Sequence, residues 1–561
     1  MKGKLLLSIL AVVGEVIVDK KVPAMICDTD VLASLTIGFI LIIVLYWKSL
    51  LQTKKPVQSI PMLPNSHWIF GHLFWLLGND YLTKQQILLE NADRDGRCSC
   101  WIGTQPSISL TCGEDAQKLL RNHHTRFSAP ILKYHFEMLA GKRNLLLLNG
   151  KEWKYYQSSL KSALYHQRRA DPSLLQRITV QTTRTLVKNI QARIRNSNSD
   201  EPQRMHSSGI DGYMKMMTQD VFGLTAFSHH FECCTNLQLS SFAKAFESIE
   251  DDILDRCLHN TLFPQNLIYS IPTKRNKTFL KNRGYLRSFL RNIIHDRLNE
   301  EHATKKSKCD ILDTLIETHA TKQKKQLEQT NQNNEEDLVD IVLSILLAGY
   351  DTVTIALTYA VFLTSRHTHW EKLCLNEIRR RNINFDNEHH LLHKIDYPLC
   401  RAVILETLRL YPVATALSRS LEKPLQLGGR VTIPEKCHVG ISVWSLHRSE
   451  KHFPEPLEFR PDRWVRYCST TQQWIERTAQ SECKEESCSI PAGNMQSFLA
   501  FSSGSRSCPG RSFAIEEASL ALAVMLDGLK FEIDSSYQPE MEWKVIVQKP
   551  KGGVPASISI R

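Results

Sequence analysis

The segment that most constrains the fold is residues 337–364, DLVDIVLSILLAGYDTVTIALTYAVFLT, which is apolar around its whole circumference. As a helix it would be about 40 Å long, enough to cross a membrane or to run through the core of a large domain. Two acids, Asp340 and Asp351, lie inside it. Because an ionised side chain is costly in a lipid-facing span, we predict a buried helix that runs through the middle of the body.

Most of the remaining chain has the periodicity of helices. Charged and apolar positions interleave at helical spacing in residues 150–195, 237–258 and 276–304. Residues 100–112 are strand-like, and residues 424–446 are rich in valine, isoleucine, glycine and proline, which is typical of short strands and turns. The sequence therefore predicts a mainly α fold with a small β region.

Three segments lack such periodicity. Residues 321–336 are polar apart from Leu327 and indicate a solvated loop or helix end. Residues 465–495 are polar with three cysteines, and we expect a surface insertion there. In residues 60–72, Pro61 and Pro64 exclude helix and favour a stiff, extended chain that could act as a spacer.

The amino terminus contains an uncharged run from Val31 to Trp47. Its length is close to the roughly 20 residues that span a bilayer. It ends in Tyr46 and Trp47, as interfacial aromatic residues often do, and Lys48, Lys54 and Lys55 follow. These features predict a membrane anchor whose downstream side is cytosolic, although a buried core helix is the alternative.

A shorter apolar run, residues 5–18, lies upstream behind two lysines and is interrupted by Glu15. It resembles a signal-peptide core that is either cleaved or paired with the second span as a hairpin. We therefore divide the chain into an anchor segment, residues 1–57, with its span at about residues 31–47, and a single large body, residues 58–561.

Composition excludes some classes of protein. The formal net charge is +12, but no basic stripe with interleaved aromatic residues is present, so we do not expect a nucleic-acid partner. The 15 cysteines are odd in number and contain no Cys-x-x-Cys pair, which argues against zinc knuckles and favours reduced thiols.

The most specific motif is FSSGSRSCPG, residues 501–510, in which Phe501, Gly504, Arg506, Cys508 and Gly510 follow the pattern Phe-x-x-Gly-x-Arg-x-Cys-x-Gly. The glycines permit a tight loop with close backbone approach. A thiolate just before a helix meets unpaired N–H groups and the positive end of the helix dipole. The loop is therefore suited to hold a negatively charged sulfur.

This segment resembles the haem-binding loop of the cytochrome P450 superfamily, in which the cysteine is the axial ligand of the iron. The resemblance covers roughly residues 58–561 and implies the P450 fold as a single large haem domain. It also implies haem b as cofactor and Cys508 as its metal ligand. A thiolate ligand pushes electron density onto the iron and favours cleavage of the O–O bond.

Two further motifs fall in the order that the family has. Glu406 and Arg409 match its Glu-x-x-Arg helix, and their spacing places both charges on one helix face. Pro461–Trp464 resembles the Pro-Glu-Arg-Phe segment, with Asp462 in place of glutamate. The resemblance implies that Arg463 joins the pair in a buried triad.

On the long apolar helix, AGYDTV (residues 348–353) is similar to the family's oxygen-activation motif. The resemblance implies that Gly349 leaves room for dioxygen and substrate. Thr352 and Asp351 would supply a hydroxyl and a carboxylate for proton delivery. The alternative for Thr352 is a hydroxyl that bonds back to its own helix.

Haem propionates require cationic partners. The resemblance assigns this role to Arg506 and Arg419, and Trp153 matches the family's Trp-x-x-x-Arg helix. The chain departs from that motif at Gln157, where the family has arginine. We therefore expect a propionate contact that is weakened or is supplied by another group, such as Lys154.

The resemblance implies a monooxygenase that inserts one oxygen atom of O2 into a small apolar substrate. Tyr350 and residues 413–417 are candidate substrate walls. Electrons would come from NADPH through a flavin reductase at the cytosolic face of the endoplasmic reticulum, or from a ferredoxin in mitochondria.

Two other functions stay open. One is a haem-thiolate isomerase or dehydratase that needs no O2, against which the retention of Thr352 beside Asp351 argues. The other is a non-catalytic haem-binding protein, for which Gln157 is the one hint.

Overall fold

The computed structural model describes residues 57–67, 71–72, 81–102, 105–123, 125, 130–196, 203–204, 209–259, 269–299, 310–326, 334–381, 383, 385, 395–468, 473–476, 495–544 and 547–561. The signal-like run at residues 5–18 and the span at residues 31–47 lie outside these residues, so the membrane anchor stays a prediction.

Helices make up most of the described chain. They are α4 (Tyr81–Glu90), α5 (Gly113–Asn122), α6 (Pro130–Ala140), α7 (Gly150–Ala170), α8 (Leu174–Asn196), α9 (Asp211–Phe227), α10 (Cys233–Asn236), α11 (Ser241–His259), α13 (Lys274–Asn299), α15 (Ile311–Gln326), α16 (Asn334–Arg366), α17 (Thr368–Arg381), α18 (Pro398–Leu410), α19 (Val443–His447) and α20 (Arg511–Gly528). The prediction of a mainly α fold is confirmed, and α7, α8, α11 and α13 cover most of the described part of the three segments with helical spacing.

The strands form small sheets. They are β1 (Arg97–Ile102), β2 (Gln105–Leu110), β3 (Gln203–Arg204), β4 (Ala416–Ser420), β5 (Leu425–Gln426), β6 (Thr432–Ile433), β7 (His438–Ser442), β8 (Val465–Cys468), β9 (Gln473–Glu476), β10 (Leu529–Glu532), β11 (Met541–Lys544), β12 (Val547–Pro550) and β13 (Ser557–Ile560). The largest sheet has the order β1-β2-β7-β4, in which β2 and β7 are parallel and the other neighbours antiparallel.

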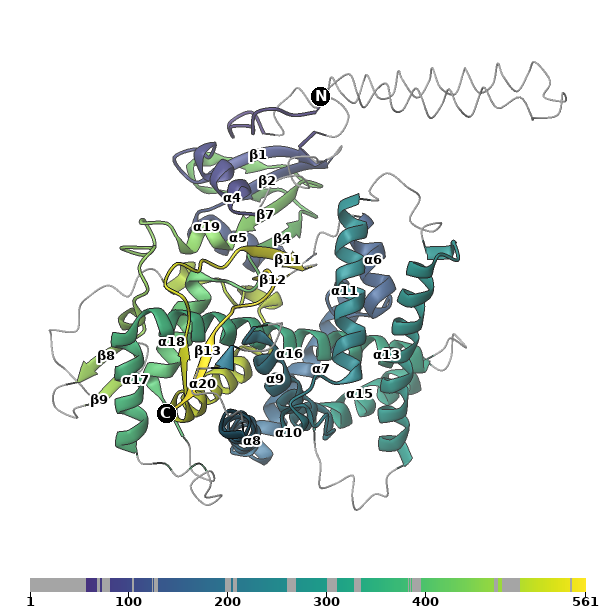
Figure 1. Cartoon of the computed structure of the whole chain (residues 1–561). Coiled ribbons are helices and arrows are strands. Elements are labelled where there is room, and N and C mark those ends of the chain that lie inside the picture. The colour runs from purple at the N-terminus through teal and green to yellow at the C-terminus, as the bar shows by residue number, and fades with distance from the viewer. Residues whose placement is uncertain are drawn as a thin grey trace, which may run out of the picture.

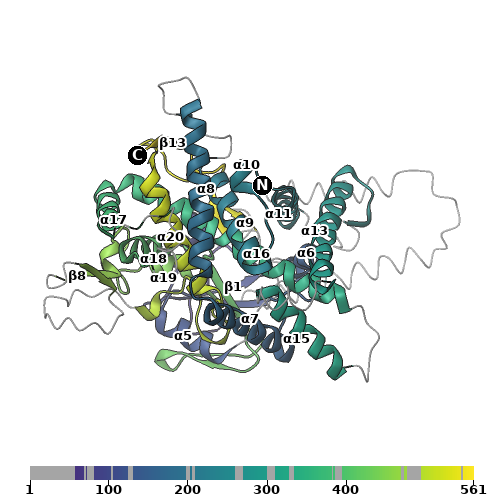
Figure 2. The ribbon, with the colours of Figure 1, turned by 90° about the horizontal axis from the view of Figure 1, so that it is seen from below.

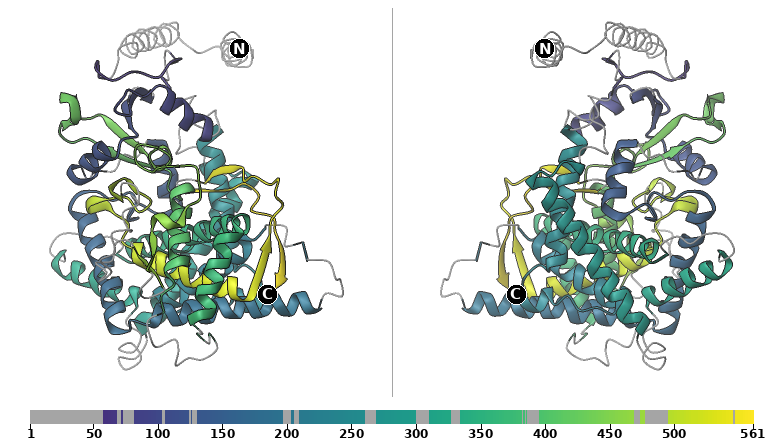
Figure 3. Two further views of the ribbon diagram at one scale, coloured as in Figure 1. Left: turned by 90° about the vertical axis from the view of Figure 1, so that its left-hand side faces the viewer. Right: turned by 90° about the vertical axis from the view of Figure 1, so that its right-hand side faces the viewer.

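Helix α16 runs across the middle of the molecule, with helices on all sides of it (Figures 1 and 2). Seen from the side in Figure 3, the outline is triangular, with the β1-β2-β7-β4 sheet toward the apex and α8 along the base. Among the described residues, Glu335–Arg366 is the one helix long and apolar enough to cross a membrane, yet 78% of its most apolar window is buried inside the protein. The prediction of a buried core helix is confirmed.

The acid nearer the start of α16 has a partner for its charge. The Asp340 carboxylate accepts a 2.7 Å contact from the Arg287 guanidinium of α13 and a 3.0 Å hydrogen bond from the Arg143 backbone N–H. Gly141, with φ of +81°, faces it closely, since an added Cβ would lie 1.9 Å from an Asp340 carboxylate oxygen. Asp340 therefore fastens α16 to α13 and to the turn between α6 and α7.

Two of the non-periodic segments contain more structure than the sequence indicates. Ile60 and Leu63 are buried, and the Leu63 N–H donates to the Ser99 carbonyl of β1 at 2.9 Å. The proline segment is therefore paired with the sheet and is not a separate spacer in its described part. The 465–495 insertion begins with the β8–β9 hairpin, and Trp474 of that hairpin packs near Trp370 of α17.

Candidate functional site

The segment 501–510 forms a tight loop that ends where α20 begins. The Cys508 backbone N–H donates to the Phe501 carbonyl at 2.9 Å, which closes the loop. Gly504 has φ of +71°, and a Cβ there would lie 2.3 Å from the Leu120 carbonyl of α5, so this position requires glycine. Gly510 is the residue immediately before α20, and a Cβ on it would lie 4.0 Å from the Cys508 sulfur.

Cys508 differs from the other cysteines in its exposure. Of the ten cysteines whose side chains the structure describes, nine are buried and Cys508 is exposed. The exposed sulfur lies three residues before the start of α20, where the unpaired N–H groups and dipole of a helix favour a thiolate. The loop thus presents one exposed sulfur just before the start of α20.

Arg506 is 4% exposed and stacks on Trp153 of α7, with its guanidinium carbon 3.8 Å from the ring centroid. Its Nη2 donates to the Leu148 carbonyl at 2.8 Å. The structure therefore brings together two of the predicted cofactor-binding residues. Stacking of this kind fixes the orientation of a guanidinium, a group suited to bind anionic ligands.

Gln157, where the family motif has arginine, contacts the same loop. Its side-chain amide donates to the Ser505 carbonyl at 2.7 Å, and the residue is 8% exposed. The side chain thus ties α7 to the loop through a neutral hydrogen bond. Lys154, the suggested substitute for the arginine, is exposed on α7.

Arg419 lies in β4 and is 2% exposed. Its guanidinium donates to the His123 carbonyl at 3.1 Å, just beyond α5, and to the Ser418 carbonyl at 2.7 Å. Because the same end of α5 contacts Gly504, α5 places Arg419 and the cysteine loop in one region. In the neighbouring 413–417 stretch, Val413 is buried and Ala416 is exposed.

Two residues of the α16 motif, Thr352 and Gly349, make contacts within the protein. Thr352 is partly exposed, and its hydroxyl donates to the Ala348 carbonyl at 2.8 Å, the back-bond that was the alternative reading. A Cβ on Gly349 would lie 2.1 Å from the Phe222 ring. Gly349 therefore allows close packing of α16 on α9, and the expectation that it leaves room for ligands is wrong.

Phe222 is a residue that the sequence did not single out. Besides touching Gly349, its ring packs edge-on to Phe513 of α20, with the centroids 6.1 Å apart. It thus connects the α16 motif to the helix that follows Cys508. Tyr350, a proposed substrate wall, is instead 1% exposed and packs near Phe246 in the core.

Asp351 points into the protein, where it is 5% exposed. Its carboxylate lies 3.9 Å from the Lys215 ammonium of α9. Lys215 also contacts Glu247 of α11. Burial lowers the pKa of Lys215, but the carboxylates of Asp351 and Glu247 outweigh it and raise that pKa above the ordinary value. No motif signalled Lys215 or Glu247.

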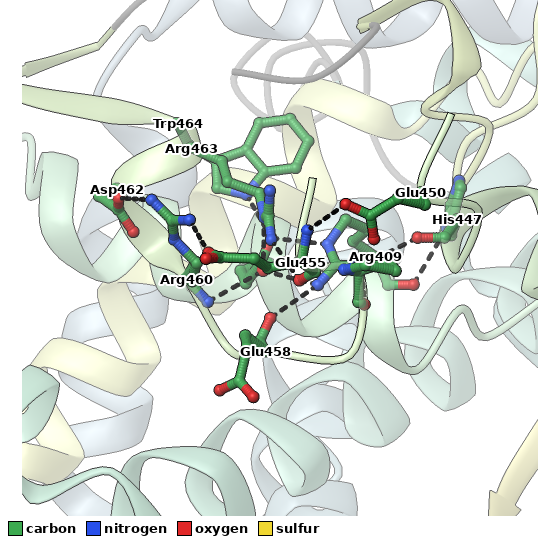
Figure 4. Close-up of polar contacts among 11 residues, drawn as sticks. Arg409, His447, Glu450, Glu455, Glu458, Arg460, Asp462, Arg463 and Trp464 are labelled. Atoms are coloured by element: carbon green, nitrogen blue, oxygen red, sulfur yellow. Dashed lines mark hydrogen bonds and ion pairs between the residues drawn. The ribbon is translucent and has the colours of Figure 1, made fainter. Parts of the chain in front are cut away.

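The predicted triad is confirmed and has more members than expected (Figure 4). The Glu406 carboxylate accepts from Arg409 at 2.8 and 3.0 Å and from Arg463 at 3.1 Å. It also accepts from the Trp464 indole at 2.9 Å and the Arg460 backbone N–H at 3.0 Å. Arg409 also donates to two backbone carbonyls, that of His447 at 2.8 Å and that of Glu458 at 2.9 Å.

His447 joins this triad to the segment before the cysteine loop. Its Nδ1 lies 3.2 Å from the Arg409 carbonyl, and its Nε2 accepts from the Leu499 backbone N–H at 2.9 Å. Burial and the neighbouring Arg409 lower the pKa of His447 to about 3, so the ring is neutral and can accept. Nothing in the sequence around His447 indicated this link.

The residues present fit a haem with one protein ligand. Among the described residues, no group of three or more His, Cys, Asp or Glu side chains could hold a metal ion, whereas one exposed sulfur is presented by a helix start. Two buried arginines, Arg419 and Arg506, lie in the region of that loop. This donor set suits a haem: the Cys508 sulfur would bind the iron, and the two arginines would meet the anionic propionates of the porphyrin.

Comparison with known proteins agrees with this geometry. The family model described as Cytochrome P450 matches residues 61–555. The chain is 24% identical over 504 residues to "Cytochrome P450 4Z1" of Homo sapiens, covering 87% of this chain and 89% of that protein. It is 23% identical over 535 residues to "Cytochrome P450 4X1" of Homo sapiens, covering 93% and 94%. It is 26% identical over 341 residues to "Secologanin synthase 1" of Catharanthus roseus, covering 60% and 59%. The match across most of the chain, together with the cysteine loop and the Glu406 triad, shows that this protein belongs to the cytochrome P450 family and is a haem b monooxygenase.

Proposed function

We propose that this protein inserts one oxygen atom of O2 into a lipid, sterol, fatty acid or xenobiotic, with Cys508 as the ligand of the haem iron. The observation that carries this proposal is the exposure of Cys508 at the end of its closed loop, while the nine other cysteines with described side chains are buried. Bound there, haem supplies the activation of O2, and the chain supplies the ligand, the proton path and the substrate pocket.

The remaining loop residues position the cofactor. Arg506, held by Trp153, and Arg419 would face the haem propionates. Phe501 closes the loop through its carbonyl, and Gly510 adjoins the Cys508 sulfur, since a Cβ there would lie 4.0 Å from it. Gln157 holds the Ser505 carbonyl in place, so the loop keeps its attachment to α7 without the family's arginine.

Protons would be delivered through Asp351 and Thr352. The Thr352 hydroxyl donates to the Ala348 carbonyl, which leaves its oxygen able to accept a further hydrogen bond. Asp351 is buried beside Lys215, so its charge is stabilised on the protein side of α16. Together they would form a pair for proton delivery, in which the Thr352 side chain is partly exposed and the Asp351 side chain is buried.

We propose that the electrons come from NADPH through a flavin reductase, with the catalytic body on the cytosolic face of the endoplasmic reticulum. The apolar run at residues 31–47 and the lysines after it support this location. The alternative is a mitochondrial membrane with a ferredoxin as donor. Reconstitution with each donor in turn distinguishes the two, because NADPH consumption that requires substrate should appear with the flavin reductase.

The carbon monoxide difference spectrum of the reduced protein tests the ligand. We expect a strongly red-shifted Soret band in the wild-type protein and its loss in Cys508→Ala. Cys468→Ala, which removes a buried cysteine, is the matched control and should keep the band. A spectrum typical of histidine ligation in the wild-type protein would refute the assignment.

The same preparation tests the reaction class. A monooxygenase consumes NADPH and O2 when substrate is added, whereas an isomerase or dehydratase converts substrate without either. Turnover that continues after O2 is removed would contradict the proposed function.

A further inference from the structure

Asp351 belongs to a buried group of charged side chains drawn from three helices, which we call the Asp351 cluster: Lys215 of α9, Glu247 and Glu250 of α11, and Asp351 of α16. Lys215 contacts Glu247 and lies 3.9 Å from Asp351. Glu250 is one helical turn beyond Glu247, on the same face of α11. The cluster therefore joins α11 and α9 to the proton-delivering part of α16.

Burial decreases sharply from one end of the cluster to the other. Glu250, Lys215 and Asp351 are 7%, 6% and 5% exposed. The Glu247 side chain is 33% exposed. Water thus reaches Glu247, while the other three groups lie in a medium of low dielectric constant. A route for protons from solvent would enter at Glu247 and end at Asp351.

The charges of the cluster do not balance when all groups are ionised, since Lys215 contacts Glu247 and Asp351 and also has Glu250 as an electrostatic neighbour. Burial raises the pKa of Glu250 well above its ordinary value, the Asp351 carboxylate raises it further, and Lys215 and Lys549 of β12 lower it. Asp251 on the same helix also raises it. Tyr350, on α16, has a raised pKa for the same reasons, burial first and then Asp351 and Glu250. Two carboxylates as deeply buried as Glu250 and Asp351, beside one contacting ammonium, favour a state in which one carboxyl group keeps its proton.

We propose that Glu250 stores the proton that replenishes Asp351, and that it acts on the reaction through Asp351. This rests on the proposed role of Asp351 in proton delivery. When Asp351 has given up a proton toward Thr352, the Glu250 O–H bond breaks and its proton moves to the Asp351 carboxylate, directly or through a bridging water. Glu250 is then the carboxylate, and it recovers a proton from solvent at the Glu247 end. No oxidant or further reactant is needed.

Three variants of the full-length protein separate proton storage from packing. Glu250→Gln keeps the shape and polarity of the side chain but carries no transferable proton. Glu250→Asp is shorter but remains an acid. Asp251→Asn removes a neighbouring carboxylate that is exposed on the same helix and is the matched control.

The first measurement is the infrared carbonyl-stretch band of protonated carboxylic acids at neutral pH, taken as a difference between wild type and variant. We expect Glu250→Gln to remove one component of this band, and Asp251→Asn to remove none. Absence of any difference for Glu250→Gln would mean that Glu250 is ionised and would overturn the proposal.

The second measurement is the share of NADPH electrons that ends in hydrogen peroxide instead of product. Proton delivery by a positioned side chain typically contributes about 100-fold or more, and we expect Glu250→Gln to raise the peroxide-to-product ratio by about tenfold. Glu250→Asp should restore most of the coupling. If the isosteric glutamine stays coupled and the shorter aspartate does not, the role is packing and the proposal fails.

These outcomes are distinct from failure of the proposed function. A wild-type protein without the thiolate spectrum, or without NADPH consumption, would overturn the monooxygenase assignment. The infrared difference does not depend on either and still reports whether Glu250 is protonated.

Discussion

Two buried charge clusters lie on different sides of the core, and they satisfy their charges in opposite ways. In the Glu406 cluster, one carboxylate accepts from two guanidinium groups, an indole and a backbone N–H, and backbone carbonyls accept from the arginines. In the Asp351 cluster, Lys215 contacts two carboxylates, Glu247 and Asp351, and has a third, Glu250, as an electrostatic neighbour. A fully paired network fixes a structure, whereas an incompletely paired one can exist in more than one protonation state. The first is therefore suited to hold the cysteine loop, and the second to move protons.

The largest effect should come from breaking the paired cluster. Glu406→Ala leaves Arg409 and Arg463 buried without their carboxylate, and we expect a loss of about 3–5 kcal/mol in the free energy of unfolding together with poor haem incorporation. Chemical denaturation followed by circular dichroism measures the first. Asp462→Asn, which removes a partly exposed partner of Arg460, is the control and should cost less than about 1 kcal/mol. Equal losses in the two variants would show that the buried Glu406 network stabilises the fold no more than a partly exposed ion pair does.

Asp351→Asn should separate function from stability in the second cluster. Without the carboxylate, we expect product formation to fall by about 100-fold while the thiolate spectrum is retained. Turnover and the carbon monoxide spectrum of the same sample provide both readings. A variant that loses the spectrum as well would show that Asp351 supports the fold in the manner of Glu406.

The pH dependence of the melting temperature should differ between the wild-type protein and Glu250→Gln. Because the pKa of Glu250 is raised in the folded protein, its acid form stabilises the fold below the ordinary pKa of about 4.5, and this contribution is lost as the pH rises toward the folded value. Glu250→Gln lacks this loss. We therefore expect the melting temperature of the variant, relative to that of the wild type, to increase as the pH rises above about 4.5. A pH-independent difference would contradict the raised pKa.

Glu247→Gln should give the smallest change. This side chain is 33% exposed, so its contact with Lys215 is screened by water and is expected to contribute less than about 1 kcal/mol to the free energy of unfolding. Thermal unfolding at two salt concentrations measures it. A loss as large as that of Glu406→Ala would show that the solvent end of the Asp351 cluster is structural.

The two clusters also differ in how far the sequence predicts them. Cys508, Arg506 and the glycines of their loop are adjacent in the chain, so a local pattern contains them. Glu406 and Arg463 are far apart but belong to motifs that occur in a known order. The additional bonds of Trp464 and His447 were not foreseen, because nothing local marks a buried indole or imidazole as a partner.

Glu250 and Lys215 lie on different helices and match no motif, so only the packing of α9, α11 and α16 brings them together. Gly349 shows the converse case. Its motif was recognised, but its interpretation was wrong because the space beside a glycine is decided by the neighbouring helix, here through Phe222.

The pairing of the proline segment with β1 has a practical consequence. Met62 and Gly71 bridge to Ser99 and Ile102, so this segment covers the edge of β1 that β2 does not occupy. A bare strand edge is a template for pairing with other chains. A protein shortened from its amino terminus to beyond residue 59 would therefore expose this edge of β1 and be prone to aggregate. A shortened protein that begins before residue 60 would keep the edge paired.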